Sequence, residues 1–150
     1  MDTYLRELDK RVLVFDGAMG TELMAQELDA AAYGGATYHG CNEAIVLARP
    51  ELIEAIHERY LEAGADVIET DTFTASRLKL AEYGLGERVG DVNRLAAELA
   101  RTACDRFSSA ERPRFVAGSL GPTGMLISSS DSALSKITFD ELAAIYGEQA

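Results

Sequence analysis

Polar residues or glycine follow directly on a short apolar run at three places in this chain. Ligands of parallel α/β proteins bind at the carboxyl ends of strands, so residues at these ends are the first candidates for chemistry. Carboxylates there would hold a cationic group, and hydroxyls would donate or accept hydrogen bonds. The candidate ligand-binding residues are Asp16 and Gly17 after the first run, Thr70, Asp71 and Thr72 after the second, and Ser119 after the third.

Asp16 and Gly17 suit the two ends of an amino acid. An ionised Asp16 would hold an ammonium group, and the backbone N–H groups around Gly17 would meet a carboxylate, because glycine lets the chain approach a ligand closely. The alternative is structural. Aspartate and glycine are favoured in turns, and Asp16 would then cap the helix that follows it.

The segment from Glu69 to Thr72 places two carboxylates and two hydroxyls at one strand end. Strand alternation puts Glu69 and Asp71 on one face and Thr70 and Thr72 on the other, so only one pair can face the centre of a site. The alternative for Asp71 is a turn or a helix cap. The glycine-rich stretch 118–124 either cradles an anion through its amides or only lets the chain turn.

Histidines and cysteines form no recognisable metal or catalytic motif. His39 and Cys41 are good zinc ligands, but a zinc site needs three or four of them. His57 falls inside an expected helix, where a packed or surface histidine is the simpler interpretation, and Cys104 is most simply a core residue. The sequence has no Ser-His-Asp order, P-loop or dinucleotide fingerprint.

The composition predicts one globular domain with its own core. Apolar residues make up 47% and charged residues 26% of the 150 residues. The net charge of −11 opposes nucleic acid and anionic membranes, so neither is expected as a partner. The absence of a secretory signal and of a membrane-spanning run predicts a cytoplasmic location, and two cysteines without a disulfide framework fit a reducing compartment.

Apolar runs alternate with amphipathic segments along the chain, which predicts strands joined by crossover helices. Pro50 is expected to start a helix and Gly64 to stop it. Thr138 and Glu141 have the spacing of a capping box. The expected strands are 12–15, 66–70 and 114–117; the expected helices are 2–10, 21–28, 50–63, 76–83, 89–107 and one that begins at the capping box, and 29–43 is an expected loop.

Three parallel strands leave two sheet edges unpaired. The closed form of this pattern is the TIM-type (β/α)8 barrel, which needs eight strands and about 250 residues. Residues 1–150 are therefore expected to be the incomplete N-terminal portion of such a barrel, with about three strands and their crossover helices. The alternative is a complete small open-sheet domain.

Five stretches, in order and over nearly the whole chain, carry a family resemblance. They are VFDGAMGT (14–21), GCNE (40–43), ARPE (48–51), YLEAGADVIETDTF (60–73) and FVAGSLGPT (115–123). Together they resemble the homocysteine S-methyltransferase family, in particular the amino-terminal homocysteine-binding domain of cobalamin-dependent methionine synthases.

The resemblance implies a (β/α)8 barrel that binds homocysteine and activates its sulfur on zinc. It implies that Asp16 and Gly17 contact the amino-acid end of homocysteine and that Thr70 matches the family's threonine at the end of the second strand. A thiol is mostly protonated at neutral pH, and zinc makes it a thiolate that attacks a methyl group. The family's three zinc-binding cysteines lie at later positions, and neither Cys41 nor Cys104 matches them.

The resemblance also implies the reaction and its participants. Methyl transfer to homocysteine would give methionine, with methylcobalamin as donor, methyltetrahydrofolate as methyl source, and downstream folate- and cobalamin-binding domains as partners. Alternatives are a stand-alone methyltransferase that uses S-methylmethionine or another small donor, and a non-catalytic barrel fragment that lacks the zinc site. Asp71 departs from the asparagine of many relatives and adds a negative charge beside the pocket.

Overall fold

The computed structural model describes residues 3–127 and 136–150. At its centre lie two parallel strands, β1 (Val67–Glu69) and β2 (Phe115–Ala117), paired so that Val67 is opposite Phe115. A third extended segment lies on the other side of β1, where Phe15 forms a parallel bridge with Val67. The three segments therefore run in one direction, and their carboxyl ends lie at the same edge.

The first expected strand, 12–15, is reduced to this single bridge. The amide of Val67 donates to the carbonyl of Val14 at 3.1 Å, and the amide of Asp16 donates to the carbonyl of Val67 at 3.0 Å. Val14 is 55% exposed. The carbonyl of Val14 accepts the amides of both Asp66 and Val67, and the Val14 amide donates to the Asp66 side chain, so the regular parallel ladder does not extend along this segment.

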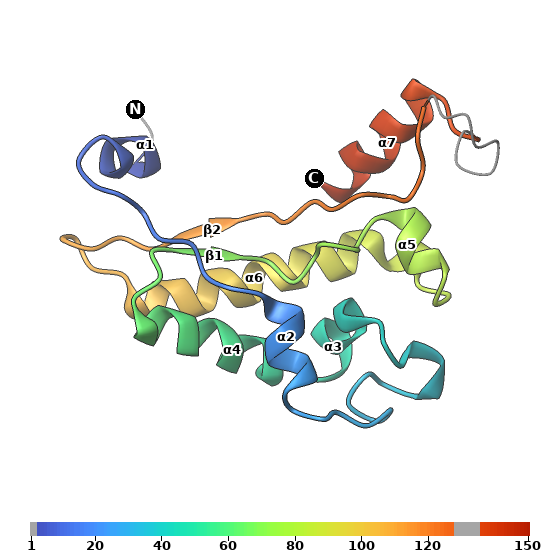
Figure 1. The fold of residues 1–150 in the computed structure, drawn as a ribbon, viewed down its shortest axis with the longest axis horizontal. Coiled ribbons are helices and arrows are strands. Elements are labelled where there is room, and N and C mark those ends of the chain that lie inside the picture. Colours follow the sequence, from blue (N-terminus) through green and yellow to red (C-terminus); the bar gives the residue numbers. More distant parts are fainter. Residues whose placement is uncertain (1–2, 128–135) are drawn as a thin grey trace.

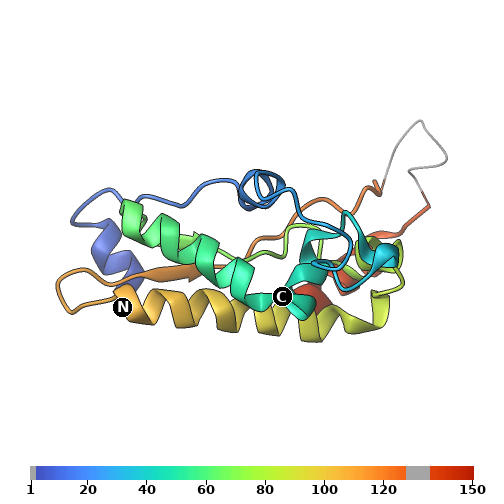
Figure 2. The same cartoon turned by 90° about the horizontal axis from the view of Figure 1, so that it is seen from below.

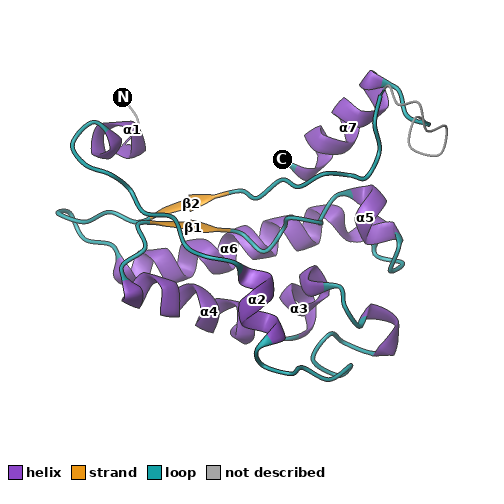
Figure 3. Ribbon diagram, viewed as in Figure 1, coloured by secondary structure: helices purple, strands orange, loops and turns teal. Residues whose placement is uncertain are grey.

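The two longest helices, α4 and α6, pack along one side of the strands. Figures 1 and 2 show α4 and α6 lying side by side beneath the strands, and Figure 3 separates helices from strands by colour. The chain passes from β1 to β2 through α5 and α6, which is the crossover that a parallel pair requires. The helices are α1 (Thr3–Leu8), α2 (Met19–Met24), α3 (Asn42–Ala48), α4 (Pro50–Ala63), α5 (Arg77–Ala81), α6 (Val89–Phe107) and α7 (Phe139–Gln149), with short 3₁₀ turns η1 (Ala36–Tyr38) and η2 (Gly86–Arg88).

The expected ends of α4 and α6 and the expected start of α7 are confirmed. Pro50 begins α4, Gly64 follows it with a left-handed φ of 111°, and Thr138 and Glu141 form the predicted capping box of α7. α6 has the predicted bounds, whereas α1, α2 and α5 are shorter than expected. The expected first residue of the helix 2–10 lies outside the described residues. The prediction of a loop up to residue 43 is wrong at its end, because α3, a helix that the sequence pattern does not predict, begins at Asn42.

α6 joins the parts of the hydrophobic core. Its buried residues Val92, Ala96 and Ala100 belong to three different apolar clusters, which include residues of α5, α4 and β1 respectively. Small side chains on this face let α6 approach the neighbouring helix and strand closely. Cys104 lies in the third cluster with no exposed surface, which confirms it as a core residue.

His57 is fully buried on α4, so the packed alternative is the correct one. Neither of its ring nitrogens has a hydrogen-bond partner among the described residues. Burial lowers the pKa of His57 to about 4, because the imidazolium form would lose its hydration without compensation.

We expect His57 to contribute a loss of folded-state stability as the pH falls from about 6.5 towards 4. In this range the unfolded chain binds a proton at His57 that the folded chain excludes, which costs roughly 2 kcal/mol at pH 5. His57→Leu should remove this loss, whereas the control His39→Gln, at an exposed position, should keep it. Urea denaturation at pH 5 and 7.5 measures the effect as the difference between each variant and the unmodified chain, and the same pH dependence in His57→Leu and the unmodified chain would contradict the prediction.

Candidate functional site

The carboxyl ends of the three extended segments meet at a cavity of about 450 Å³. Another side of the cavity is closed by Asn42 and Glu43, the first two residues of α3, and by Thr74. The structure thus brings together residues that lie far apart in the sequence. Five of the six predicted ligand-binding residues line this cavity: Asp16, Gly17, Thr70, Asp71 and Ser119.

Asp16 is tied to the tip of β1. Its two carboxylate oxygens accept the backbone N–H of Glu69 at 3.1 and 3.2 Å. It is not the cap of α2, whose N-cap residue is Ala18, without a side-chain cap. Burial, with a smaller contribution from the charge of Glu69, raises the pKa of Asp16 to about 6, although the N–H of Glu69 opposes the shift. Asp16 is therefore mainly ionised at neutral pH.

Gly17 lies against the ring of Tyr60. A Cβ atom at this position would lie 2.8 Å from the Tyr60 hydroxyl oxygen and 3.0 Å from a ring carbon. A side chain here would displace the tyrosine, so glycine is needed for the close approach of these two segments. Gly17 and the three residues that follow it line the cavity.

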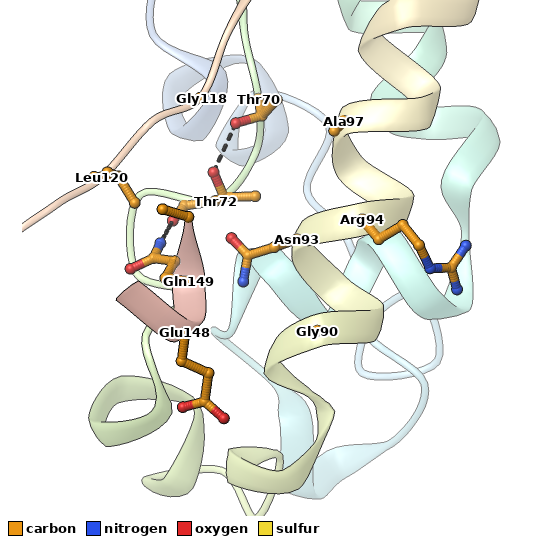
Figure 4. A pocket seen from close by; sticks show the side chains of 11 residues that line it. Thr70, Thr72, Gly90, Asn93, Arg94, Ala97, Gly118, Leu120, Glu148 and Gln149 are labelled. Carbon is orange, nitrogen blue, oxygen red and sulfur yellow. Dashed lines mark hydrogen bonds between the residues drawn. The ribbon is translucent and has the colours of Figure 1, made fainter. Parts of the chain in front are cut away.

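The hydroxyls of Thr70 and Thr72 connect the ends of β1 and β2. The Ser119 amide donates to the Thr70 hydroxyl at 3.0 Å, the two threonine hydroxyls lie 2.6 Å apart, and the Thr72 hydroxyl donates to the Ser119 carbonyl at 2.8 Å. Thr72 lines a second cavity of about 400 Å³, where the side-chain amide of Gln149 donates to its carbonyl (Figure 4). Thr72 is therefore the one predicted residue that does not line the first cavity, although its hydroxyl contacts Thr70 and Ser119.

Asp71 is the most unusual side chain of the first cavity. It is only 6% exposed, and its Oδ2 atom has no hydrogen-bond partner within the described part of the chain. Burial, reinforced by the charge of Glu43, raises the pKa of Asp71 to about 8. The helix-cap alternative is wrong for Asp71, because Ser76 caps α5 by accepting the amide of Lys79.

Glu43 was not among the sequence-predicted site residues. It is 4% exposed and accepts hydrogen bonds from the Thr74 amide at 2.8 Å and the Thr74 hydroxyl at 2.5 Å. The thiol of Cys41 lies 3.8 Å from its other oxygen. The available signal was an acid directly before the apolar run 44–46, which is unusual for an exposed loop.

The donor atoms of the described residues do not fit a zinc site. No group of three or more His, Cys, Asp or Glu side chains that could hold a metal ion occurs in residues 3–127 and 136–150. Cys41 and Cys104 lie in different core clusters, and burial raises the pKa of each thiol to about 11.

None of the described helices is both long and apolar enough to cross a membrane.

Gly121 sets the distance between the loop after β2 and the segment after β1. Its amide donates to the carbonyl of Phe73 at 2.9 Å, and a Cβ atom on Gly121 would lie 2.3 Å from that oxygen. Gly118, in the same loop, has no atom within 4 Å of a Cβ position.

We expect Gly121→Ala to destabilise the chain by about 1–3 kcal/mol, because backbone must move to relieve the overlap. Gly118→Ala is the matched control and should change the stability by less than about 0.5 kcal/mol. Urea denaturation compares the two variants. Equal stabilities would show that the two loops do not depend on this close contact.

The comparisons with known proteins agree on one family. The family model for homocysteine S-methyltransferase matches residues 13–150. A methionine synthase from Mycobacterium tuberculosis (strain ATCC 25618 / H37Rv) is 42% identical over 115 residues, which are 77% of this chain and 10% of that protein.

Solved structures give the same picture. The metallated and oxidized forms of the homocysteine methyltransferase MmuM from Escherichia coli superpose with a TM-score of 0.64 each, at 31% and 33% identity. The matched region covers 78% of this chain and 40% of theirs. The chain thus spans a tenth of the methionine synthase and two fifths of the MmuM structures.

Proposed function

Because the chain belongs to the homocysteine S-methyltransferase family, we propose that its cavity binds the amino-acid end of homocysteine. In this proposal, residues 1–150 are the N-terminal part of a (β/α)8 barrel within a longer cytoplasmic protein, and further strands complete the wall of the cavity. The supporting observation is that Asp16, Gly17 and Asp71 come together at the carboxyl ends of parallel strands.

Each end of the ligand has a matching group in the cavity. The carboxylate of Asp16 would accept the ammonium group, since it is mainly ionised at neutral pH and faces the cavity. The backbone N–H groups next to Gly17 would meet the ligand carboxylate, because no side chain at Gly17 blocks them. The thiol of homocysteine would then point away from Asp16, towards the rest of the barrel.

Methyl transfer to that thiol would give methionine. The match to a methionine synthase supports methylcobalamin as donor, methyltetrahydrofolate as methyl source, and folate- and cobalamin-binding domains as partners. Zinc belongs to the same proposal, with its ligands outside this chain, because the described residues do not fit a zinc site. The 150 residues alone are expected to transfer no methyl group.

The match to MmuM supports a second candidate, a stand-alone methyltransferase that uses a small donor such as S-methylmethionine. The cavity described here would bind homocysteine in either case. Measuring methyl transfer by the full-length protein from methylcobalamin and from S-methylmethionine distinguishes the two candidates.

We expect Asp16→Asn to weaken homocysteine binding by the full-length, zinc-loaded protein at least tenfold, since a hydrogen bond to a charged group contributes roughly 1.5–3 kcal/mol. Binding by the unmodified protein should also weaken as the pH falls through about 6, because Asp16 then becomes protonated. Calorimetric titration measures both effects.

The matched control is Glu62→Gln, which removes one negative charge from the exposed surface of α4. It should leave the affinity unchanged. Equal affinities for Asp16→Asn and the unmodified protein would refute the role of Asp16, and failure of the unmodified protein to bind homocysteine would refute the proposed function.

A further inference from the structure

Two buried carboxyl groups of the cavity, those of Asp71 and Glu43, differ in their partners. Glu43 accepts two hydrogen bonds from Thr74, and the Cys41 thiol lies 3.8 Å from its Oε2 atom. The Oδ2 atom of Asp71 has no partner among the described residues, although less than a tenth of the residue is exposed. Glu43 therefore has hydrogen-bond donors from the protein, whereas the Oδ2 atom of Asp71 has none in the described part of the chain.

An unpartnered carboxylate is costly inside a protein, so the uncharged acid is favoured at Asp71. The negative charge of Glu43 adds to this preference, and together the two effects raise the pKa of Asp71 to about 8. Asp71 therefore keeps its proton at neutral pH while the cavity is empty.

The other charged groups around the cavity do not offset this charge. Asp16 and Glu69, from the first extended segment and from β1, are also acids, and no lysine, arginine or histidine is among the described residues that line the cavity. Lys79 lines a neighbouring cavity with Glu43, but its ammonium group is paired with Glu82 at 2.9 Å. The cavity thus presents acceptors for a cation, and none of its described lining residues is a cation.

We propose that Asp71 is a proton-coupled binding residue, protonated in the empty cavity and ionised when the ammonium group of the ligand binds between it and Glu43. This inference rests on the proposed function, because the ligand is taken to be an amino acid. The N–H donors of an ammonium group match the free acceptor oxygen of Asp71, and the charge of Glu43 beside it adds to the attraction. The cation favours the ionised form of Asp71, so its O–H bond breaks and the proton passes to solvent, while the ammonium group keeps its own protons.

Calorimetric titration in two buffers of different ionisation enthalpy counts the released protons. The probe is methionine, because it has no thiol that could release a second proton. At pH 7 the full-length protein should release nearly one proton for each methionine bound, and Asp71→Asn should release almost none. Glu62→Gln should behave like the unmodified protein, and 4-(methylthio)butanoate, which lacks the ammonium group, should bind without release.

A second measurement needs no ligand. Because the pKa of Asp71 is higher in the folded than in the unfolded chain, Asp71 should contribute a loss of stability as the pH rises from about 4 to about 8, opposite in sign to the contribution of His57. Asp71→Asn should remove this part of the loss, so its urea midpoint should exceed that of the unmodified chain by a large margin at pH 7.5 and by a much smaller one at pH 4.5.

The outcomes separate the two proposals. Methionine binding without proton release, or an unchanged pH dependence of stability in Asp71→Asn, would overturn the role of Asp71 and leave the proposed function intact. If the unmodified protein bound neither homocysteine nor methionine, the proposed function would fail, and the role of Asp71 with it.

Discussion

The site depends on the fixed alignment of three parallel segments, and a single buried acid controls that alignment. Asp66 accepts hydrogen bonds from Arg11 at 2.8 Å, from the Val14 amide at 3.1 Å and from Arg114 at 3.2 Å. Burial opposes its charge, but the hydrogen bonds from Arg11 and Val14 outweigh burial and hold the pKa of Asp66 below its usual value. A buried charge must be fully paired, so Asp66 fixes both neighbouring segments at the start of β1.

This alignment decides which side chains of β1 remain available for a ligand. With the register fixed, alternation directs Thr70 and Thr72 towards the end of β2, where their hydroxyls hold both polar backbone atoms of Ser119. The same alternation leaves Asp71 in the cavity with an unpaired oxygen. The threonines therefore stabilise the site, while Asp71 keeps an oxygen atom that can accept a hydrogen bond from a cationic ligand. Ionisable groups with a strongly shifted pKa, such as Asp71, are common at functional sites.

The sequence was sufficient for the order of the elements other than α3 and the short 3₁₀ turns, and for five of the cavity residues, because both depend on local signals. A proline start, a glycine stop and a capping box mark the helices, and polar residues after apolar runs mark the strand ends. Strand 12–15 was overestimated because its pairing depends on neighbours distant in sequence. Glu43 was missed for the same reason, since its value to the site comes from Thr74 and Asp71 across the cavity.

Asp16 and Asp71 show how two acids in one cavity acquire different charges. Asp71 is buried and Asp16 only partly so. Asp16 also accepts the N–H of Glu69, which supports its ionised form, whereas the charge of Glu43 near Asp71 opposes ionisation there. At neutral pH the cavity therefore holds one acid ready to attract a cation and one that ionises only when the cation has arrived. An uncharged ligand of the same shape would gain nothing from the second acid, so this arrangement selects for the ammonium group itself.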